Sequence, residues 1–197
     1  MIRPLDDLIR EAQAMPKGDA RWARIAHLAH GALEEAGPLT LAISGSSHIE
    51  GADEVWWMLS RLVPVGDGVG PHITRVIHGG CPTGADAAVD GALVLWAERN
   101  AECTGDYDRR PMVSEPIRAD WTALGRAAGP VRNGILLDGA QVWAGLWDGR
   151  KEKCGTWDTM NQARERGWLM WLERVASGSS ATAYLFGIHP DIYKETP

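Results

Sequence analysis

The sequence His78-Gly79-Gly80-Cys81-Pro82-Thr83-Gly84-Ala85-Asp86 lies between an apolar run and the longest helical pattern of the chain. The run before it, residues 73–77, is typical of a buried strand, so the stretch predicts a turn from a strand into a helix. Two adjacent glycines allow positive φ and a close backbone approach to a ligand. The N–H groups of such a turn lie at the positive end of a helix, and the stretch therefore predicts an anion or phosphate pocket.

A purely structural interpretation of this turn stays open beside the first one. Thr83 and Asp86 have the spacing of a capping-box variant, in which both side chains satisfy free N–H groups at the start of a helix. Because a glycine-rich turn alone does not separate the two interpretations, the other motifs of the chain have to decide.

The composition is that of a globular protein with a substantial core. The chain has 197 residues, of which 45% are hydrophobic and 23% are charged. Its net charge of −6 argues against broad binding to nucleic acid or to an anionic membrane. The sequence has no apolar run of about 18 residues and no signal-peptide core at its start, so we expect a cytoplasmic protein with no membrane partner.

Cysteines, histidines and tryptophans restrict the chemistry further. Cys81, Cys103 and Cys154 are far apart and form no C-x-x-C motif, which predicts reduced thiols and neither a disulfide framework nor a zinc site. His27 and His30 have a metal-ligand spacing but no third ligand, and we expect no metal and no cofactor. Ten tryptophans stand against one phenylalanine, and we expect one or two of them to line a pocket for a planar ligand.

Strand and helix patterns alternate about five times along the chain. We expect a helix over about residues 5–36 with a break at 16–18, and strands at 39–44, 73–77, 112–117, 141–147 and 168–172. Gly129-Pro130 is expected to begin a further helix at Val131. Parallel strands need helical crossovers, so the pattern predicts an α/β, Rossmann-like fold. Its mostly parallel sheet has about five strands flanked by helices.

The predicted organisation has three parts. Residues 1–37 form an N-terminal helical extension, residues 38–176 the Rossmann-like domain, and residues 177–197 a C-terminal tail that begins with small residues and continues as a short polar segment. The sequence leaves the role of this tail open.

Four polar turns follow the predicted strands, at residues 45–48, 79–86, 120–133 and 147–156. Because the carboxyl ends of parallel strands meet at one edge of a sheet, ligands bind there. The guanidinium groups of Arg126 and Arg132 suit a phosphate, although exposed ion pairs are the alternative role for these arginines. A tryptophan in these turns suits a stacked base. The candidate ligand-binding residues are Gly45, Ser46, Ser47, His48, Gly79, Gly80, Thr83, Gly84, Asp86, Asp120, Trp121, Arg126, Gly129, Arg132, Asn133, Trp147, Asp148, Gly155 and Thr156.

Three ordered motifs over residues 39–175 resemble the YspA/YpsA-like branch of the SLOG superfamily. They are Gly79-Gly80-x-x-Thr83-Gly84-Ala85-Asp86, then Asp120-Trp121-x-x-x-Gly125-Arg126-Ala127-Ala128-Gly129-Pro130-x-Arg132-Asn133, and Trp147-Asp148-Gly149 with Gly155-Thr156. The resemblance implies a Rossmann-like sheet that binds nucleotides or nucleotide-derived ligands, and a homo-oligomer. The superfamily also contains cytokinin-activating phosphoribohydrolases and a DNA-processing protein.

Two departures from the family pattern concern its chemistry. The first turn reads Gly45-Ser46-Ser47-His48 where the branch usually has Gly-Ser-Arg, so a cation is missing. The hydrolases of the superfamily carry a glutamate where this chain has Thr159. Asp158 is one residue away, and one residue turns a helical side chain by about 100°. The second departure weighs against hydrolysis.

The sequence therefore predicts a receptor or sequestering protein for a nucleotide derivative, in nucleotide signalling or defence. The phosphate is expected on the N–H groups of Gly79 to Gly84 and the base on a tryptophan such as Trp147 or Trp121. One alternative is a hydrolase of N-glycosidic bonds, with Asp86, Asp120, Asp148 or Asp158 as its carboxylate. Another is a protein-interaction module that contacts its partner through Trp56, Trp57 and the N-terminal helix.

Overall fold

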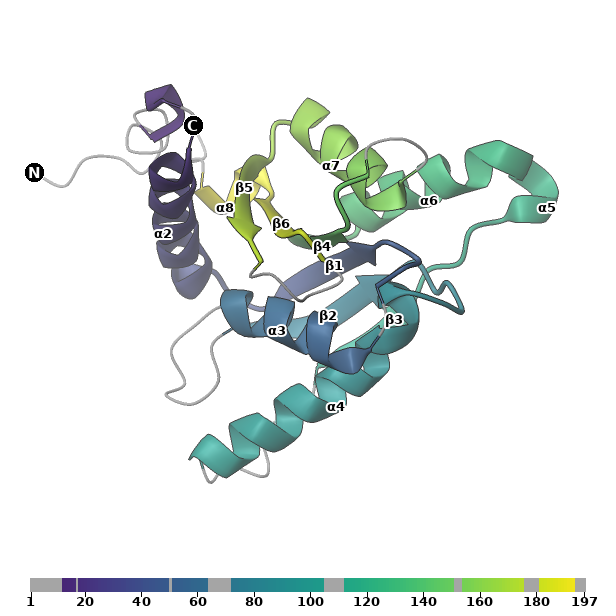
Figure 1. The fold of residues 1–197 in the computed structure, drawn as a ribbon, viewed down its shortest axis with the longest axis horizontal. Coiled ribbons are helices and arrows are strands. Elements are labelled where there is room, and N and C mark those ends of the chain that lie inside the picture. Colours follow the sequence, from purple (N-terminus) through teal and green to yellow (C-terminus); the bar gives the residue numbers. More distant parts are fainter. Residues whose placement is uncertain are drawn as a thin grey trace, which may run out of the picture.

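The computed structural model describes residues 12–16, 18–49, 51–63, 72–104, 112–150, 154–175 and 181–193. Helices and strands alternate through most of this part of the chain (Figure 1). The elements are α2 (Asp19–Glu35), β1 (Leu39–Gly45), α3 (Ala52–Leu62), β2 (Ile73–His78), α4 (Ala85–Thr104), β3 (Val113–Pro116), α5 (Trp121–Leu124), the 3-10 helix η1 (Gly125–Ala127), α6 (Ala128–Asp138), β4 (Val142–Trp147), α7 (Gly155–Glu165), β5 (Leu169–Arg174), β6 (Ala183–Ile188) and α8 (Pro190–Tyr193).

The strands form one six-stranded sheet in the order β3-β2-β1-β4-β6-β5. Strands β3, β2, β1 and β4 are parallel neighbours, whereas β6 runs antiparallel to both β4 and β5. Five strands therefore point the same way and one points against them. The predicted α/β, Rossmann-like fold with a mostly parallel sheet flanked by helices is confirmed.

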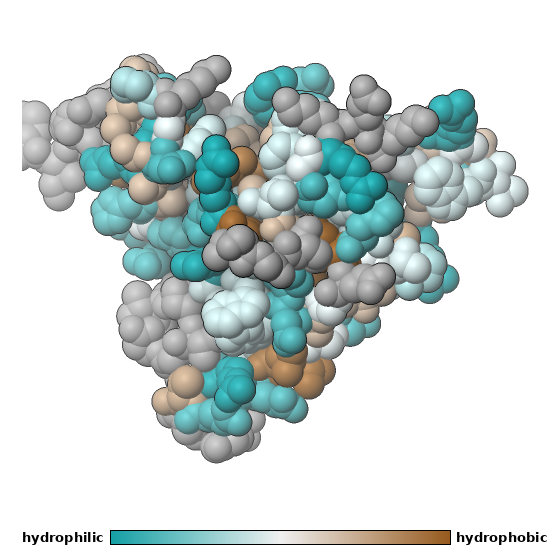
Figure 2. Space-filling view, in the orientation of Figure 1, coloured by the Kyte–Doolittle hydropathy of each residue, from teal (hydrophilic) through white to brown (hydrophobic). Residues whose placement is uncertain are grey.

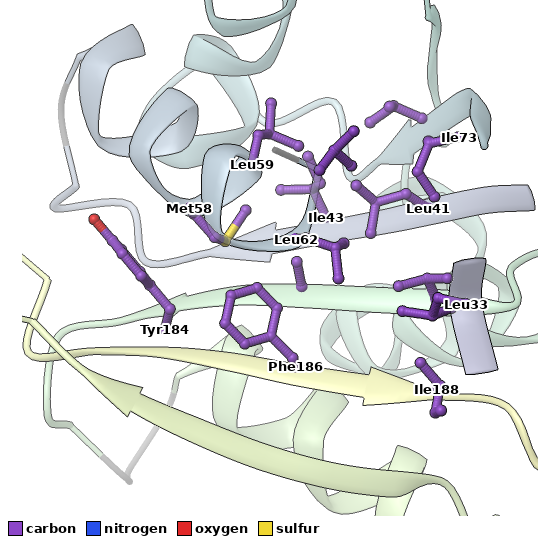
Figure 3. Packing of buried hydrophobic residues seen from close by; sticks show 14 of the residues in the cluster. Leu33, Leu41, Ile43, Met58, Leu59, Leu62, Ile73, Tyr184, Phe186 and Ile188 are labelled. Atoms are coloured by element: carbon purple, nitrogen blue, oxygen red, sulfur yellow. The ribbon is translucent and has the colours of Figure 1, made fainter. Parts of the chain in front are cut away.

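Side chains alternate between the two faces of the sheet, and helices cover both faces. On β1, Leu41 and Ile43 pack with α2, α3 and α4, while Ala42 between them faces α6 and α7. Figure 3 shows the first of these layers, where leucines of α3 meet residues of β1 and β6. On β4, Trp143 lies in the second layer, and its indole N–H donates to Ser44 Oγ at 3.0 Å.

The segment predicted to be a tail contains the strand β6, which lies between β4 and β5. All six of its residues are buried, and each pairs with β4 on one side and with β5 on the other. The prediction of a polar tail over 177–197 is therefore wrong for residues 183–188. The apolar run Ala-Tyr-Leu-Phe-Gly-Ile has the strand signal, and the strand count rises from about five to six.

One predicted helix begins earlier in the structure than expected, and the start of another lies outside the described residues. Helix α6 begins at Ala128 instead of Val131, with Pro130 inside its first turn, where a missing backbone N–H costs nothing. The helix expected over 5–36 is confirmed as α2 after the break at 16–18, but residues 5–11 lie outside the described part. None of the described helices is long and apolar enough to cross a membrane.

The packing of Trp171 on β6 predicts a large loss of stability when its indole is removed. Trp171 is 1% exposed and stacks on Phe186 with 5.1 Å between ring centroids. We expect Trp171→Ala to lower the free energy of unfolding by about 3–5 kcal/mol, measured by urea denaturation. Trp57→Ala is the matched control, because Trp57 is 55% exposed and its loss should cost about 0.5 kcal/mol or less. Equal losses would contradict the placement of Trp171.

Candidate functional site

The four predicted turns meet at the carboxyl edge of the parallel strands, where two adjoining cavities open. The polar cavity has a volume of about 470 Å³ and is lined by Gly45, Ser46, Ser47, His48, Cys81, Thr83, Asp86, Arg132, Asp148, Arg150, Cys154 and Gly155. The tryptophan cavity has a volume of about 530 Å³ and is lined by Trp121, Arg126, Gly129, Pro130, Arg132, Asn133, Cys154, Gly155, Trp157, Asp158 and Asn161. Because Arg132, Cys154 and Gly155 belong to both, the cavities join there.

The carboxylate of Asp86 occupies the turn after β2. Its Oδ2 accepts the N–H of Cys81 at 3.2 Å and lies 3.6 Å from Nη1 of Arg132. Two more N–H groups of the turn are also used, since Gly80 donates to His78 Nδ1 and Ala85 to the carbonyl of Ser46. The sequence predicted a phosphate at this turn, but a carboxylate of the protein lies there. The contact gives Asp86 a structural role in the turn, but among the described residues neither Thr83 nor Asp86 makes the bond to an N–H group at the start of α4 that the predicted capping box requires.

Gly79 makes room for the ion pair between Asp86 and Arg132. A Cβ at this position would overlap the Arg132 guanidinium and approach Asp86 Oδ2 to 2.5 Å. The side chain of Asp86 is only 7% exposed and that of Arg132 17%. Asp86 belongs to α4 and Arg132 to α6, so the pair connects helices on opposite faces of the sheet.

The turns after β1 and β2 touch through small residues. A Cβ on Gly45 would overlap Ala85, and one on Gly84 would come within 2.5 Å of the carbonyl oxygen of Ser46. Gly84 also has φ of +74°, a conformation that favours glycine. These contacts hold the turn after β1 against the start of α4. Residues of the turn and residues beside the start of the helix therefore line the same polar cavity.

Asp148 is held by Ser46 and Arg150. Its Oδ2 accepts the Ser46 hydroxyl at 2.6 Å and lies 2.9 Å from Arg150 Nε, while its Oδ1 accepts the Arg150 N–H at 3.1 Å. Burial raises the pKa of Asp148, but these hydrogen bonds and the Arg150 charge outweigh it and lower the pKa below its ordinary value. Arg150 thus supplies a cation beside the first turn, where the family pattern has its own arginine.

Asp158 lines the tryptophan cavity and is held by amides instead of a cation. Its Oδ2 accepts from Asn133 Nδ2 at 2.8 Å and from Gln162 Nε2 at 2.9 Å. Asn133 in turn accepts from Arg132 Nε at 3.0 Å. Thr159 points away from the cavity, because it is fully buried and its hydroxyl donates to the Gly155 carbonyl. The carboxylate nearest to the hydrolase position therefore does reach a cavity.

Two tryptophans and an arginine complete the tryptophan cavity. Trp157 stacks on Trp147 with ring centroids 5.3 Å apart and an interplanar angle of 28°. Trp121 is 62% exposed and lies beside Gly129. Arg126 makes no hydrogen bond or ion pair with the described residues. The cavity thus combines aromatic rings with a cation that is available to a ligand.

The residues around Trp121 project from the molecule. Every residue from 120 to 127 is exposed, and Figure 1 shows α5 at the far end of the arm formed with α6. Leu124, Val131 and Ile135 are further exposed apolar residues of this arm. In Figure 2 hydrophilic residues predominate on the visible face, and apolar ones appear at separate places.

Most of the predicted ligand-binding residues line a cavity, but six do not. Gly79, Gly80 and Gly84 shape the β2 turn from behind, and Asp120 caps α5 by accepting the Ala123 N–H at 2.9 Å. Thr156 is fully buried and its hydroxyl donates to the Leu146 carbonyl. Trp147 supports Trp157 and donates its indole N–H to the Arg150 carbonyl.

Sequence reasoning missed several lining residues. Arg150 stands directly after the Asp148-Gly149 turn signal, and Trp157 and Asn161 follow the Gly155-Thr156 helix start with helical spacing. Arg150 lies within the fourth predicted turn and could have been added there as a cation, and Trp157 and Asn161 could have been found by extending that turn into the first two turns of its helix.

No family model, curated protein or solved structure matches this chain. The likeness of its three motifs to the SLOG superfamily stays a prediction. The described residues contain no group of three or more His, Cys, Asp or Glu side chains that could hold a metal ion.

His78 and His30 predict a loss of stability on mild acidification. Burial lowers the pKa of His78 below 6.5, although Asp86 and Asp90 act to raise it, and burial likewise lowers the pKa of His30. The unfolded chain then binds more protons than the folded one, so the free energy of unfolding falls as the pH drops below about 6.5. Asp148 acts in a lower window, because the stability that it contributes is lost only as the pH falls below about 4.

Urea denaturation at pH 7, 6 and 5 measures this dependence. In His78→Asn an amide oxygen can still accept the Gly80 N–H, but the titration is gone, so the fall between pH 7 and 5 should be smaller than in the wild type. An identical fall in both proteins would exclude His78 as a source of the pH dependence.

Proposed function

We propose that the protein binds a phosphorylated nucleoside or a derivative of one, as a receptor or sequestering protein. The observation that carries the proposal is the tryptophan cavity, where two indole rings, two arginines and the start of α7 surround one space. Its volume of about 530 Å³ lies in the range of small-molecule sites. The three motifs that resemble the SLOG superfamily support the same ligand class.

The aromatic part of the ligand stacks in the tryptophan cavity. Trp157 is supported from behind by Trp147 at 5.3 Å, which makes it a fixed platform, and Trp121 offers a second ring from the projecting arm. Stacking of a base on an aromatic side chain contributes about 1–3 kcal/mol. Of the two predicted stacking partners, Trp121 lines this cavity and Trp147 does not, so the proposal keeps Trp121 and puts Trp157 in place of Trp147.

The phosphate lies near Arg126, Arg132 and the start of α7. Asp86 already occupies the turn after β2, so a phosphate there would meet a carboxylate. At α7 the N-cap residue Cys154 makes no side-chain hydrogen bond to the first turn. Helix N-termini attract anions through their free N–H groups and their dipole.

Cleavage of the N-glycosidic bond is a second candidate function, and the position of Asp158 favours it. This carboxylate lines the tryptophan cavity and is oriented by two amides, which is a suitable arrangement for an acid or base. Cleavage predicts that free base appears in solution and that Asp158→Asn binds the nucleotide without releasing base. A receptor instead returns the nucleotide intact.

The receptor proposal predicts that nucleoside 5′-monophosphates bind and that Arg126 contributes to their affinity. In isothermal titrations of AMP, GMP, CMP and UMP, we expect at least one to bind. Arg126→Ala should weaken it by about 1.5–3 kcal/mol, the range for hydrogen bonds to charged groups. Because Arg126 is exposed and pairs with none of the described residues, the substitution should leave the fold intact.

Arg24→Ala is the matched control, since Arg24 is an exposed arginine of α2 that lines neither cavity. Its affinity for the nucleotide should equal that of the wild type. If no monophosphate binds, or if Arg126→Ala and Arg24→Ala behave alike, the proposed phosphate position is wrong.

A further inference from the structure

We infer that the ligand is a nucleoside diphosphate sugar, with its sugar in the polar cavity and its base in the tryptophan cavity. This inference rests on the proposed function, which places only the base and a phosphate. It concerns the polar cavity, which a nucleoside monophosphate bound in the tryptophan cavity would leave empty.

The two cavities have similar sizes and a common junction. Their volumes are about 470 Å³ and about 530 Å³, and each alone reaches the range of a small-molecule site. They share Arg132, Cys154 and Gly155. A ligand that is anchored in the tryptophan cavity and carries its charge at this junction therefore points its other end into the polar cavity.

The charges of the polar cavity are already balanced by its own side chains. Asp86 pairs with Arg132 at 3.6 Å and Asp148 pairs with Arg150 at 2.9 Å. A phosphate deep in this cavity, away from the junction, would lie beside the carboxylates of Asp86 and Asp148. An uncharged group that forms many hydrogen bonds fits the charge balance better.

Hydroxyl groups and a carboxylate oxygen are available to such a group. Ser47 and Thr83 are exposed and line the cavity, and His48 lies next to them. Asp86 is nine-tenths buried, and both of its contacts with described residues, Cys81 N–H and Arg132, use Oδ2. Its Oδ1 accepts no hydrogen bond from the described residues. A sugar supplies both the O–H donors for this oxygen and the acceptors for the hydroxyls.

Arg132 connects the two halves of the ligand. Its Nη1 faces Asp86 in the polar cavity, and its Nε donates to Asn133 in the tryptophan cavity. A diphosphate placed here would leave a nucleoside on one side and a sugar on the other. The planar guanidinium of arginine can donate two hydrogen bonds to the oxygens of a phosphate.

Matched ligand series test the inference. The probes are AMP, ADP and ADP-ribose, then GMP, GDP and GDP-mannose, then UMP, UDP and UDP-glucose, each titrated by calorimetry. In one series we expect the sugar-bearing member to bind at least about tenfold more tightly than the monophosphate, because two or more hydrogen bonds are added. In the double variant Ser47→Ala/Thr83→Ala this ratio should fall towards one, whereas Trp157→Ala should weaken every member that binds.

The outcomes separate the inference from the proposed function. Equal affinities for the monophosphate and the sugar-bearing member overturn the inference and leave the proposed function standing. A ratio that the double variant does not change also overturns it. If no member of any series binds, the proposed function fails and the inference falls with it. Thermal unfolding checks that the double variant and Trp157→Ala are folded. We expect the double variant to keep its fold because Ser47 and Thr83 are exposed.

Discussion

The ion pair between Asp86 and Arg132 joins the two helical layers above the carboxyl edge of the sheet. Each partner is largely buried, so removing one would leave the other as an unpaired charge, at a cost of about 3–5 kcal/mol. The pair exists because Gly79 has no side chain in its way. It also determines what the edge can bind, since Asp86 occupies the β2 turn and Arg132 lies at the junction of the two cavities. The fold and the site therefore depend on the same two side chains.

The two cavities differ in how their charges are satisfied. In the polar cavity each carboxylate has an arginine partner, and the turn after β1 is tied to the turn after β4 by the contact of Ser46 with Asp148. In the tryptophan cavity Asp158 is held by neutral amides, and Arg126 pairs with none of the described residues. The proposed ligand, with one charged and aromatic part and one neutral and polar part, is matched to this difference.

The position of the site could be predicted from the sequence, but its internal contacts could not. Glycine-rich turns after apolar runs predicted the edge at which the two cavities open, because parallel strands bring their carboxyl ends together. The spacing of Thr83 and Asp86 fits both a cap and an anion pocket, and neither pattern predicts that the carboxylate reaches the Cys81 N–H. The stacking of Trp147 on Trp157 joins the end of a strand to a helix over a separation of ten positions in the sequence, which no local pattern reports. Strand β6 was not predicted although its sequence is an apolar run. No local pattern indicates that a segment near the end of the chain lies between β4 and β5 in the sheet.

The insertion of β6 affects the order in which the protein assembles during synthesis. Strand β5 is translated before β6, yet among the described strands it pairs with β6 alone. Until residues 183–188 have left the ribosome, β4 presents an unpaired edge with apolar side chains and β5 has no strand to pair with. Open edges of this kind invite pairing with other chains. The growing polypeptide thus passes through a stage in which most of the edge that carries the two cavities is already encoded but the sheet beneath it is still incomplete.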